Sequence, residues 1–380
     1  MHVLPVASGK GGVGKSLFAS NIAIALAEAG KKVVLADLDL GASNLHLILG
    51  IGAVQQGIGT FLTSSKLNFE DIIIDTEYKN LRFIPGDAEI PGMANLKTSQ
   101  KTKLIRRLFT LDADFLILDL GAGTSFNTID FFLSSSMGVI VTAPTLTSTL
   151  NAYLFLKNTV FRLMSTIFSK KSPAGMYLDR LRREGTSLQK VYIPKLLERI
   201  RLDDPDSYLK YEERMKNFHP MLILNMLENP KDAARADKIR RSTKEYLGVD
   251  MEHLGVIYFD HFQEIALNSR LPVIKYKPEC VLSQALYRIA DKLIQKDDDN
   301  VYTLDVEELK NSYVTANMEA EIDFSVKAET MEEMLKSGAL TEGDLIDTIK
   351  AQHYEITALK KENNFIKTQL AKAINEGFTM

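Results

Sequence analysis

The feature that most constrains this chain is a glycine-rich loop, residues 8–16, which reads Ser-Gly-Lys-Gly-Gly-Val-Gly-Lys-Ser. A short apolar run precedes it at 3–7, and apolar residues at helical spacing follow it over 15–29. Gly9 and Gly14 stand at the fixed glycine positions of a phosphate-binding loop, in the strand–loop–helix context that such a loop needs. Glycines are required because the backbone must curl so that successive N–H groups point at phosphate oxygens. The loop therefore predicts a nucleotide-binding unit of strand, loop and helix.

Two side chains and the backbone of this loop have separate predicted roles. Lys15 is placed to reach the β and γ phosphates, and the hydroxyl of Ser16 can enter the coordination shell of Mg²⁺. The N-terminus of the following helix adds its free N–H groups and its dipole. The residues expected to contact the nucleotide are Gly9, Lys10, Gly11, Gly12, Val13, Gly14, Lys15, Ser16 and Leu17. A glycine turn that binds no nucleotide is the alternative, but the strand, the helix, Lys15 and Ser16 all argue against it.

Short apolar runs recur along the first 296 residues and alternate with helical segments. They lie at 3–7, 33–36, 115–118, 138–142 and 221–224. Strands that are apolar on both faces are typical of a parallel sheet covered by helices. The predicted fold class is α/β: a doubly wound, mostly parallel sheet of the P-loop NTPase type, with a helical insertion and a C-terminal helical tail.

Three aspartates follow strands at the edge of the sheet that carries the glycine loop. Asp119 comes directly after the run 115–118, and Asp37 and Asp39 close the run 33–36. The carboxyl ends of parallel strands line the ligand crevice of open α/β sheets. Asp119 is therefore a candidate for the magnesium shell, and Asp39 is a candidate for orienting a water molecule that attacks the γ phosphate. An aspartate that merely caps a turn is the alternative for each.

Charge divides the chain near residue 296. Residues 297–380 hold 18 acidic residues, 8 lysines and no arginine, a net charge of −10, so residues 1–296 carry +7 within the total of −3. This step predicts a nucleotide-binding domain over 1–296 and an acidic helical tail over 297–380. One continuous domain with an acidic face is the alternative. An acidic tail is not expected to lie on anionic lipid or nucleic acid, because like charges repel.

Two further segments stand out from this plan. Residues 158–217 look inserted, and 161–217 contain 13 Lys or Arg against 8 Asp or Glu, a net charge of +5. Such a basic helical outgrowth is predicted to meet a membrane, an acidic partner or the acidic tail, or else to pack as a cap with a solvated face.

In the tail, apolar residues at spacings of four and three predict a coiled coil over 345–374, with Asn363 at a core position that favours two strands. An amphipathic helix folded back on the domain is the alternative.

Composition excludes several other classes of protein. The single cysteine, Cys280, excludes a disulfide framework and clusters of thiolate-bound metal. No apolar stretch approaches 18 residues and no export signal is evident, so a cytoplasmic location is expected. The six histidines show no metal-ligand spacing, and no Ser-His-Asp or paired-acid hydrolase arrangement emerges.

The motifs together resemble those of the MinD/ParA group of deviant Walker A ATPases. The resemblance rests on the loop 10–16, where the additional lysine, Lys10, is the distinguishing mark. Segments 37–44 and 119–123 are similar to the first and second switches of that group. The Gly-Ala-Gly of 121–123 looks more like the flagellar-number regulators of the FlhG (FleN) type, because MinD and ParA proteins more often have proline at its first position. The similarity covers about residues 1–157 and 218–295.

This resemblance implies a dimer driven by ATP and Mg²⁺. In the family, two subunits close face to face around two Mg-ATP molecules. Carried onto this chain, Lys10 would stabilise charge on the γ phosphate held by the partner subunit, while Lys15 serves its own nucleotide. Hydrolysis in such a cycle is slow and acts as a timer that opens the dimer.

The resemblance also implies roles for residues outside the loop. Asp39 would orient the attacking water, and the magnesium shell would involve Ser16, Asp39 and Asp119, largely through water molecules. Gly121 would sense the γ phosphate through its backbone N–H. Asn225 would meet the adenine edge.

By resemblance, the chain is expected to be an ATPase switch that controls the number or placement of flagella, or of a similar polar structure, through a protein partner of that machinery. Alternatives from the same group are ParA-like partitioning of chromosomes or cargo and MinD-like placement of the division site. A non-enzymatic alternative is a scaffold or antiactivator that nucleotide locks in one conformation. The sequence leaves peripheral contact with the inner face of the plasma membrane open. The net charge of +7 on residues 1–296 allows nucleic acid binding but does not favour it.

Overall fold

The computed structural model of the chain describes residues 1–87, 96–183, 191–298 and 306–336, together with five single residues of the tail. These five are Thr357, Leu359, Asn363, Ile366 and Lys367. The chain divides into two units, Met1–Phe324 and Ser325–Met380. The predicted coiled coil over 345–374 lies outside the described residues, apart from those five, and stays a prediction.

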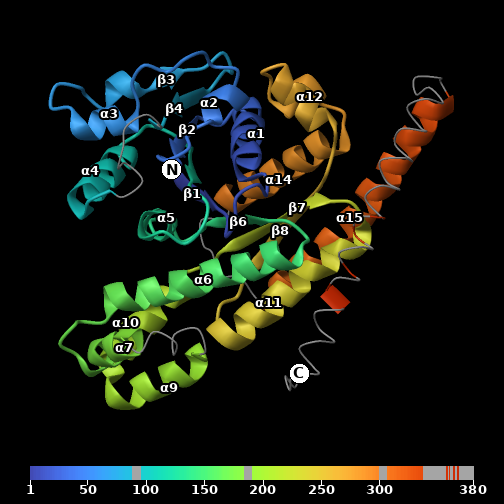
Figure 1. Cartoon of the computed structure of the whole chain (residues 1–380). Coiled ribbons are helices and arrows are strands. Elements are labelled where there is room, and N and C mark those ends of the chain that lie inside the picture. The colour runs from blue at the N-terminus through green and yellow to red at the C-terminus, as the bar shows by residue number, and fades with distance from the viewer. Residues whose placement is uncertain are drawn as a thin grey trace. The chain divides into compact units, whose positions relative to one another are not determined.

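An eight-stranded sheet forms the centre of the first unit (Figure 1). Its strands are β1 (His2–Ala7), β2 (Val33–Leu38), β3 (Ile74–Asp75), β4 (Leu81–Ile84), β5 (Phe115–Leu120), β6 (Val139–Thr142), β7 (Met221–Leu227) and β8 (Glu252–Tyr258). Their order across the sheet is β3-β4-β2-β5-β1-β6-β7-β8, and each neighbouring pair is parallel except β3 and β4. The prediction of a mostly parallel α/β sheet is confirmed.

Helices cover both faces of this sheet. They are α1 (Lys15–Glu28), α2 (Leu45–Ile48), α3 (Ile58–Thr63), α4 (Thr98–Leu108), α5 (Phe126–Phe132), α6 (Leu146–Ile167), α7 (Pro173–Arg183), α9 (Ile193–Asp203), α10 (Pro205–Lys216), α11 (Ala234–Leu247), α12 (Phe262–Asn268), α13 (Val273–Tyr276), α14 (Val281–Asp298) and α15 (Val306–Lys336). Short 3-10 turns lie at Glu70–Ile72 and Pro230–Ala233. None of the helices in the described ranges is long and apolar enough to cross a membrane.

The alternation of side chains along each strand divides the core into two clusters. On β5, Leu116 and Leu118 belong to the cluster that α4, α5, α6 and α11 cover, whereas Phe115 and Ile117 belong to the cluster that α1, α13 and α14 cover. All four side chains are buried. This explains why the strand run is apolar at every position, as a sheet covered on both faces requires.

The sheet register places the predicted site residues at one edge. Asp37 of β2 pairs with Asp119 of β5, and Asp119 also pairs with Val6 of β1. The glycine loop follows β1 directly, so the two aspartates and the loop meet at the carboxyl ends of three neighbouring strands. This is the edge where ligands bind in open α/β sheets.

The segment predicted as an insertion forms the end of α6 and the helices α7, α9 and α10. Its buried apolar residues include Leu178, Leu181, Ile193, Leu196 and Ile200. Leu197 is half-buried, and Leu188 lies outside the described residues. The buried leucines and isoleucines pack the outgrowth against α6 and α11, so it is continuous with the core of the first unit.

The first compact unit ends later than the predicted boundary at residue 296, because α15 packs on the core. Four residues on one face of α15, Leu309, Tyr313, Ala316 and Ala320, are buried. The Tyr313 hydroxyl donates a hydrogen bond of 2.8 Å to the carbonyl oxygen of Met251. Arg288 of α14 pairs with Asp323 through two hydrogen bonds of 3.0 and 2.7 Å. The charge step at 296 marks a change of surface composition, whereas the compact unit runs to Phe324.

Candidate functional site

The glycine loop connects β1 to the N-terminus of α1, as predicted, and its backbone needs glycine at two places for different reasons. Gly14 has φ 82°, in the left-handed region that favours glycine. A Cβ atom at Gly14 would also lie 2.2 Å from the side-chain amide of Asn225. At Gly9, a Cβ atom would lie 2.1 Å from the carbonyl oxygen of Asn151 in α6. The loop is therefore packed tightly between β7 and α6.

Lys15 is the first residue of α1, and its ammonium points at the end of β5. Its Nζ lies 2.5 Å from Asp119 Oδ1 and 3.3 Å from the hydroxyl of Ser16. The side chains of Lys15 and Asp119 are 7% and 2% exposed, so the pair is shielded from water. The structure thus brings together three residues that the sequence assigned to phosphate and magnesium.

Asp37 is buried next to this pair and organises the loop that follows β2. Its carboxylate accepts hydrogen bonds from the Ser43 hydroxyl at 2.7 Å, the Asp39 N–H at 3.1 Å and the Leu45 N–H at 3.3 Å. Burial and the nearby charge of Asp119 raise the pKa of Asp37 to about 6. Burial also raises the pKa of Asp119, although its bonds to Lys15 oppose that shift.

The sequence places Asp37 at the edge of the sheet but predicts no role of its own for it. In the structure its three hydrogen bonds hold the segment 39–45 that follows β2. The sequence feature that indicates this role is Ser43, six residues after Asp37. At that spacing its hydroxyl can close a tight loop on the carboxylate.

Asp39 and Gly121 face each other across the two switch segments. A Cβ atom at Gly121 would lie 3.3 Å from Asp39 Oδ1 and 3.7 Å from the hydroxyl of Thr128. The N–H of Gly123 donates a hydrogen bond of 2.9 Å to the carbonyl oxygen of Ser8. Segment 119–123 therefore lies against the glycine loop, and Asp39 lies beside that segment.

Lys10 lies apart from the buried cluster. Its side chain is exposed, as are Gly11 and Gly12. Within the described part of the chain, Lys10 has no hydrogen bond or ion pair. The two lysines of one loop thus differ: Lys15 is held inside the subunit, and Lys10 is presented at its surface.

Asn225, predicted to meet the adenine edge, contacts the glycine loop. Its side-chain Nδ2 donates a hydrogen bond of 2.9 Å to the carbonyl oxygen of Val13. Asn225 is buried, and the next residue, Met226, has φ 61° at an irregularity in the pairing of β7 with β8. This bulge turns the end of β7 toward the loop. The sequence does not predict this contact with Val13.

The oxygen atoms of Asp119, Asp39 and Ser16 are of the kind that Mg²⁺ prefers. Among the described residues, no group of three or more His, Cys, Asp or Glu side chains is arranged to hold a metal ion alone. A magnesium ion here would therefore need phosphate oxygens and water as its remaining ligands, which is its usual arrangement in nucleotide sites. The residues present fit that arrangement.

Comparison with known proteins agrees with this geometry. Residues 1–161 match the ParA family, described as NUBPL iron-transfer P-loop NTPase. The septum site-determining protein MinD of Helicobacter pylori is 34% identical over 148 residues, covering 38% of this chain and 54% of MinD. The flagellum site-determining protein YlxH of the same organism is 32% identical over 159 residues, covering 40% of this chain and 52% of YlxH. The chain thus spans about half the length of these two relatives.

The antiactivator FleN of Pseudomonas aeruginosa matches over a longer stretch. It is 23% identical over 296 residues, which is 77% of this chain and 86% of FleN. Among solved structures, MinD of Pyrococcus furiosus has a TM-score of 0.54 at 20% identity, covering 78% of this chain and all but 1% of that one. MinD of Pyrococcus horikoshii, complexed with Mg-ADP, has a TM-score of 0.54 at 21% identity, covering 79% and 99%. At these identities the likeness between structures shows the fold.

Proposed function

Since this chain belongs to the ParA/MinD family of P-loop NTPases, we propose that it is an ATP-dependent dimerisation switch that hydrolyses ATP slowly. Its proposed task is to regulate the number or placement of flagella, or of a similar polar structure. The long match to FleN and the match to YlxH support the flagellar assignment. A protein of the flagellar or polar machinery is the proposed partner.

The observation that carries the dimer proposal is the exposed position of Lys10. Lys15 already lies within its own site, where it can neutralise its own nucleotide. An exposed lysine in the same loop is available to a nucleotide held by a second subunit. A cation delivered from outside to the γ phosphate would make pairing depend on ATP.

Exposed apolar side chains near the same sheet edge support the proposal further. Phe126, Leu146 and Leu150 are 68%, 77% and 54% exposed. They lie on α5 and α6, which follow the carboxyl ends of β5 and β6, the two neighbours of β1. Contact with a second subunit would remove this apolar surface from water.

Within one subunit, the residues of the site are proposed to act as follows. When ATP binds, the ammonium of Lys15 exchanges its contact with Asp119 for contacts with the β and γ phosphates. Asp119 and Ser16 then hold the magnesium shell, which supplies positive charge to neutralise the phosphates. Asp39 orients the attacking water, and the backbone N–H of Gly121 senses the γ phosphate.

Asn225 is proposed to contact adenine in addition to its bond to the glycine loop. Its Nδ2 uses one of its two N–H groups on the carbonyl oxygen of Val13, and its Oδ1 can accept a hydrogen bond from the adenine amino group. We propose that the residue serves both the loop and the base.

Division-site placement is the second candidate function, and the 34% identity with MinD of Helicobacter pylori favours it. An antiactivator role, suggested by the name of FleN, is a third, and it requires nucleotide binding without rapid turnover. Counting flagella and mapping septa in cells that lack the gene separates the first two. A changed flagellar count with normal septa supports the flagellar role, and displaced septa with a normal count contradict it.

The dimer proposal is tested with the Asp39→Ala variant ended after Lys336, which removes the predicted coiled coil over 345–374 and with it any pairing that needs no nucleotide. In this variant hydrolysis should be blocked and ATP retained. Light scattering should show twice the subunit mass with ATP and Mg²⁺, and the subunit mass with ADP. The Lys10→Ala/Asp39→Ala variant should bind ATP and stay at the subunit mass. Equal masses with and without ATP, or a dimer that survives the loss of Lys10, would contradict the proposal.

A further inference from the structure

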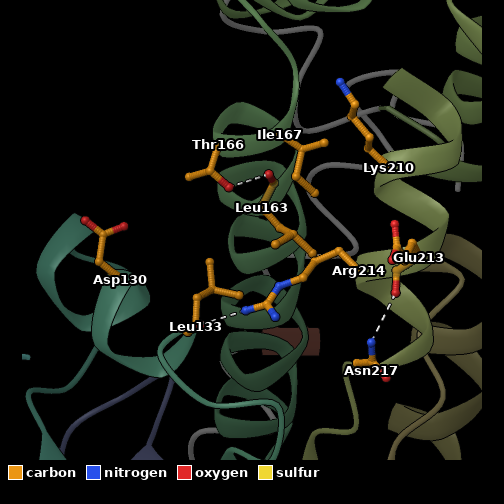
Figure 2. Close-up of a pocket in the computed structure, with 9 residues that line it drawn as sticks. All are labelled: Asp130, Leu133, Leu163, Thr166, Ile167, Lys210, Glu213, Arg214 and Asn217. Atoms are coloured by element: carbon orange, nitrogen blue, oxygen red, sulfur yellow. Dashed lines mark hydrogen bonds between the residues drawn. The ribbon is translucent and has the colours of Figure 1, made fainter. Parts of the chain in front are cut away.

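A groove lies between α5, α6 and α10, away from the nucleotide site (Figure 2). Its volume is about 610 Å³, within the range of protein ligand sites. We call it the α10 groove. Leu133, Leu163 and Ile167 line its apolar part, and Lys210, Glu213 and Arg214 line the side formed by α10. Except for Asp130 and Leu133, the lining therefore comes from the segment 158–217, which the family resemblance does not cover.

The apolar part of the α10 groove is partly open to solvent. Leu163 is buried, whereas Leu133 and Ile167 are half-buried. Leu133 directly follows α5, and the two others lie one turn apart on α6. An apolar side chain inserted between them would be covered on two sides by these helices.

The α10 side of the groove carries cations that no acid in the described residues neutralises. Lys210 and Arg214 lie one turn apart on α10, are exposed, and make no ion pair within the described ranges. Arg214 makes only a long hydrogen bond of 3.4 Å, to the carbonyl oxygen of Leu133. Glu213, which is also exposed, is the one acid that α10 contributes to the described groove lining.

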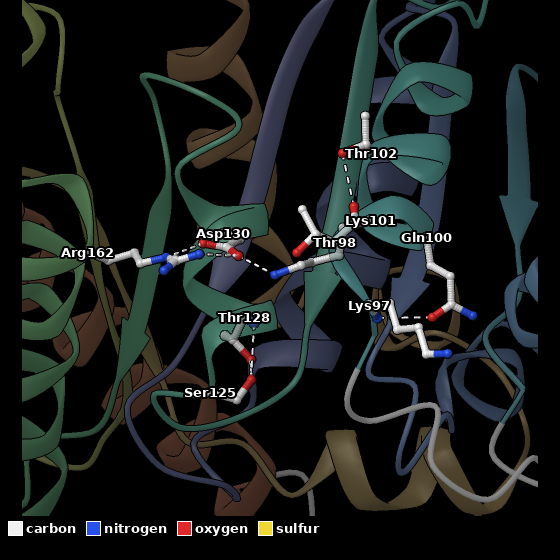
Figure 3. Close-up of polar contacts among 9 residues, drawn as sticks. All are labelled: Lys97, Thr98, Gln100, Lys101, Thr102, Ser125, Thr128, Asp130 and Arg162. Carbon is white, nitrogen blue, oxygen red and sulfur yellow. Dashed lines mark hydrogen bonds and ion pairs between the residues drawn. The ribbon is translucent and has the colours of Figure 1, made fainter. Parts of the chain in front are cut away.

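The carboxylate of Asp130, at the α5 end of the groove, is already paired with two other cations (Figure 3). Arg162 of α6 donates to both of its oxygens, at 2.6 and 2.9 Å, and Lys101 of α4 pairs with it from the other side. Burial alone would raise the pKa of Asp130, but these two cations lower it, which keeps the carboxylate charged and bound to them. Asp130 is therefore not free to balance Lys210 and Arg214.

We propose that the α10 groove docks an acidic segment of a partner protein, with a bulky apolar side chain between Leu133, Leu163 and Ile167 and carboxylates on Lys210 and Arg214. Charge complementarity favours this occupant, since the segment 161–217 carries a net charge of +5. A nucleic acid duplex fits less well, because Glu213 and the apolar part of the groove would face its phosphates. This docking needs no nucleotide and goes beyond the proposed switch.

The test is a selection of random twelve-residue peptides, displayed on phage, on the immobilised full-length chain. The native chain should enrich peptides in which Asp or Glu flanks a bulky apolar residue. The Lys210→Glu/Arg214→Glu variant should not enrich them, and a selected peptide should bind it at least tenfold more weakly by fluorescence anisotropy. The Ile167→Asp variant should also lose the peptide, which tests the apolar part independently of the rim charge.

A matched control reverses two exposed lysines in loops away from the groove, Lys66→Glu/Lys79→Glu, and it should keep the native enrichment. All variants are first checked for a native circular dichroism spectrum and thermal transition. No enrichment of acidic–apolar peptides by the native chain overturns the proposal, as does binding that survives reversal at Lys210 and Arg214. The proposal is also overturned if charge reversal at Lys210 and Arg214 abolishes only the binding of duplex DNA or of phosphatidylglycerol vesicles, because these cations then serve another ligand.

Discussion

Lys15 Nζ lies 2.5 Å from Asp119 Oδ1 in a site where both side chains are almost fully buried. The lysine of the phosphate-binding loop is thus engaged by an acid of its own subunit. Breaking such a pair by removing one partner leaves an uncompensated buried charge. Removal of either partner should therefore destabilise the fold.

We predict that Lys15→Ala lowers the free energy of unfolding by about 3 kcal/mol, because Asp119 is left buried without its cation. Urea denaturation followed by circular dichroism measures this change. The Lys15→Ala/Asp119→Asn variant should be less destabilised than the sum of the two single variants, since the pair is removed as a unit. Additive effects would show that the two side chains do not stabilise each other.

Asn225→Ala separates the two roles proposed for that residue. Its bond to Val13 holds the loop, so the variant should lose about 1 kcal/mol of binding free energy for tripolyphosphate, which has no base. If the residue also meets adenine, ATP should lose more than tripolyphosphate. Isothermal titration calorimetry with both ligands gives the difference. An unchanged affinity for tripolyphosphate would contradict the positioning role.

The parts of the site that could be predicted are those encoded locally. The glycine spacing fixes the loop, and the runs 33–36 and 115–118 fix the strands that carry the aspartates. Because parallel strands end at a common edge, Asp119 and Lys15 could be placed together without a structure. Their contact confirms that reasoning.

The parts that could not be predicted depend on residues distant in sequence. The bond from Asn225 to Val13 joins β7 to the loop after β1, and no local pattern encodes it. The end of the compact unit at Phe324 also depends on distant residues. A charge step describes composition, whereas the packing of Tyr313 and Asp323 against the core depends on tertiary partners such as Arg288.

Asp130→Asn should loosen the contact of α5 with α4 and α6. Two cations bind this carboxylate, and its side chain is 17% exposed, so we expect a loss of about 1–2 kcal/mol in unfolding free energy. The matched control is Asp112→Asn, whose partner Lys32 is exposed, and it should show no measurable change. Urea denaturation at low and high salt compares the two. Equal effects at both positions would contradict the predicted difference.

His253 of β8 should make the protein sensitive to mild acid. Its ring packs against Tyr313 with centroids 5.1 Å apart, and burial, helped by Lys292, lowers its pKa to about 3. The folded state therefore keeps the ring neutral at pH 5, while the unfolded chain binds a proton below about pH 6.5. Stability should fall as the pH drops, and this residue should account for about 2 kcal/mol of the loss between pH 7 and pH 5. Urea denaturation at both values measures it. His253→Gln should show a pH dependence smaller by that amount, and an equal loss in both proteins would contradict the prediction.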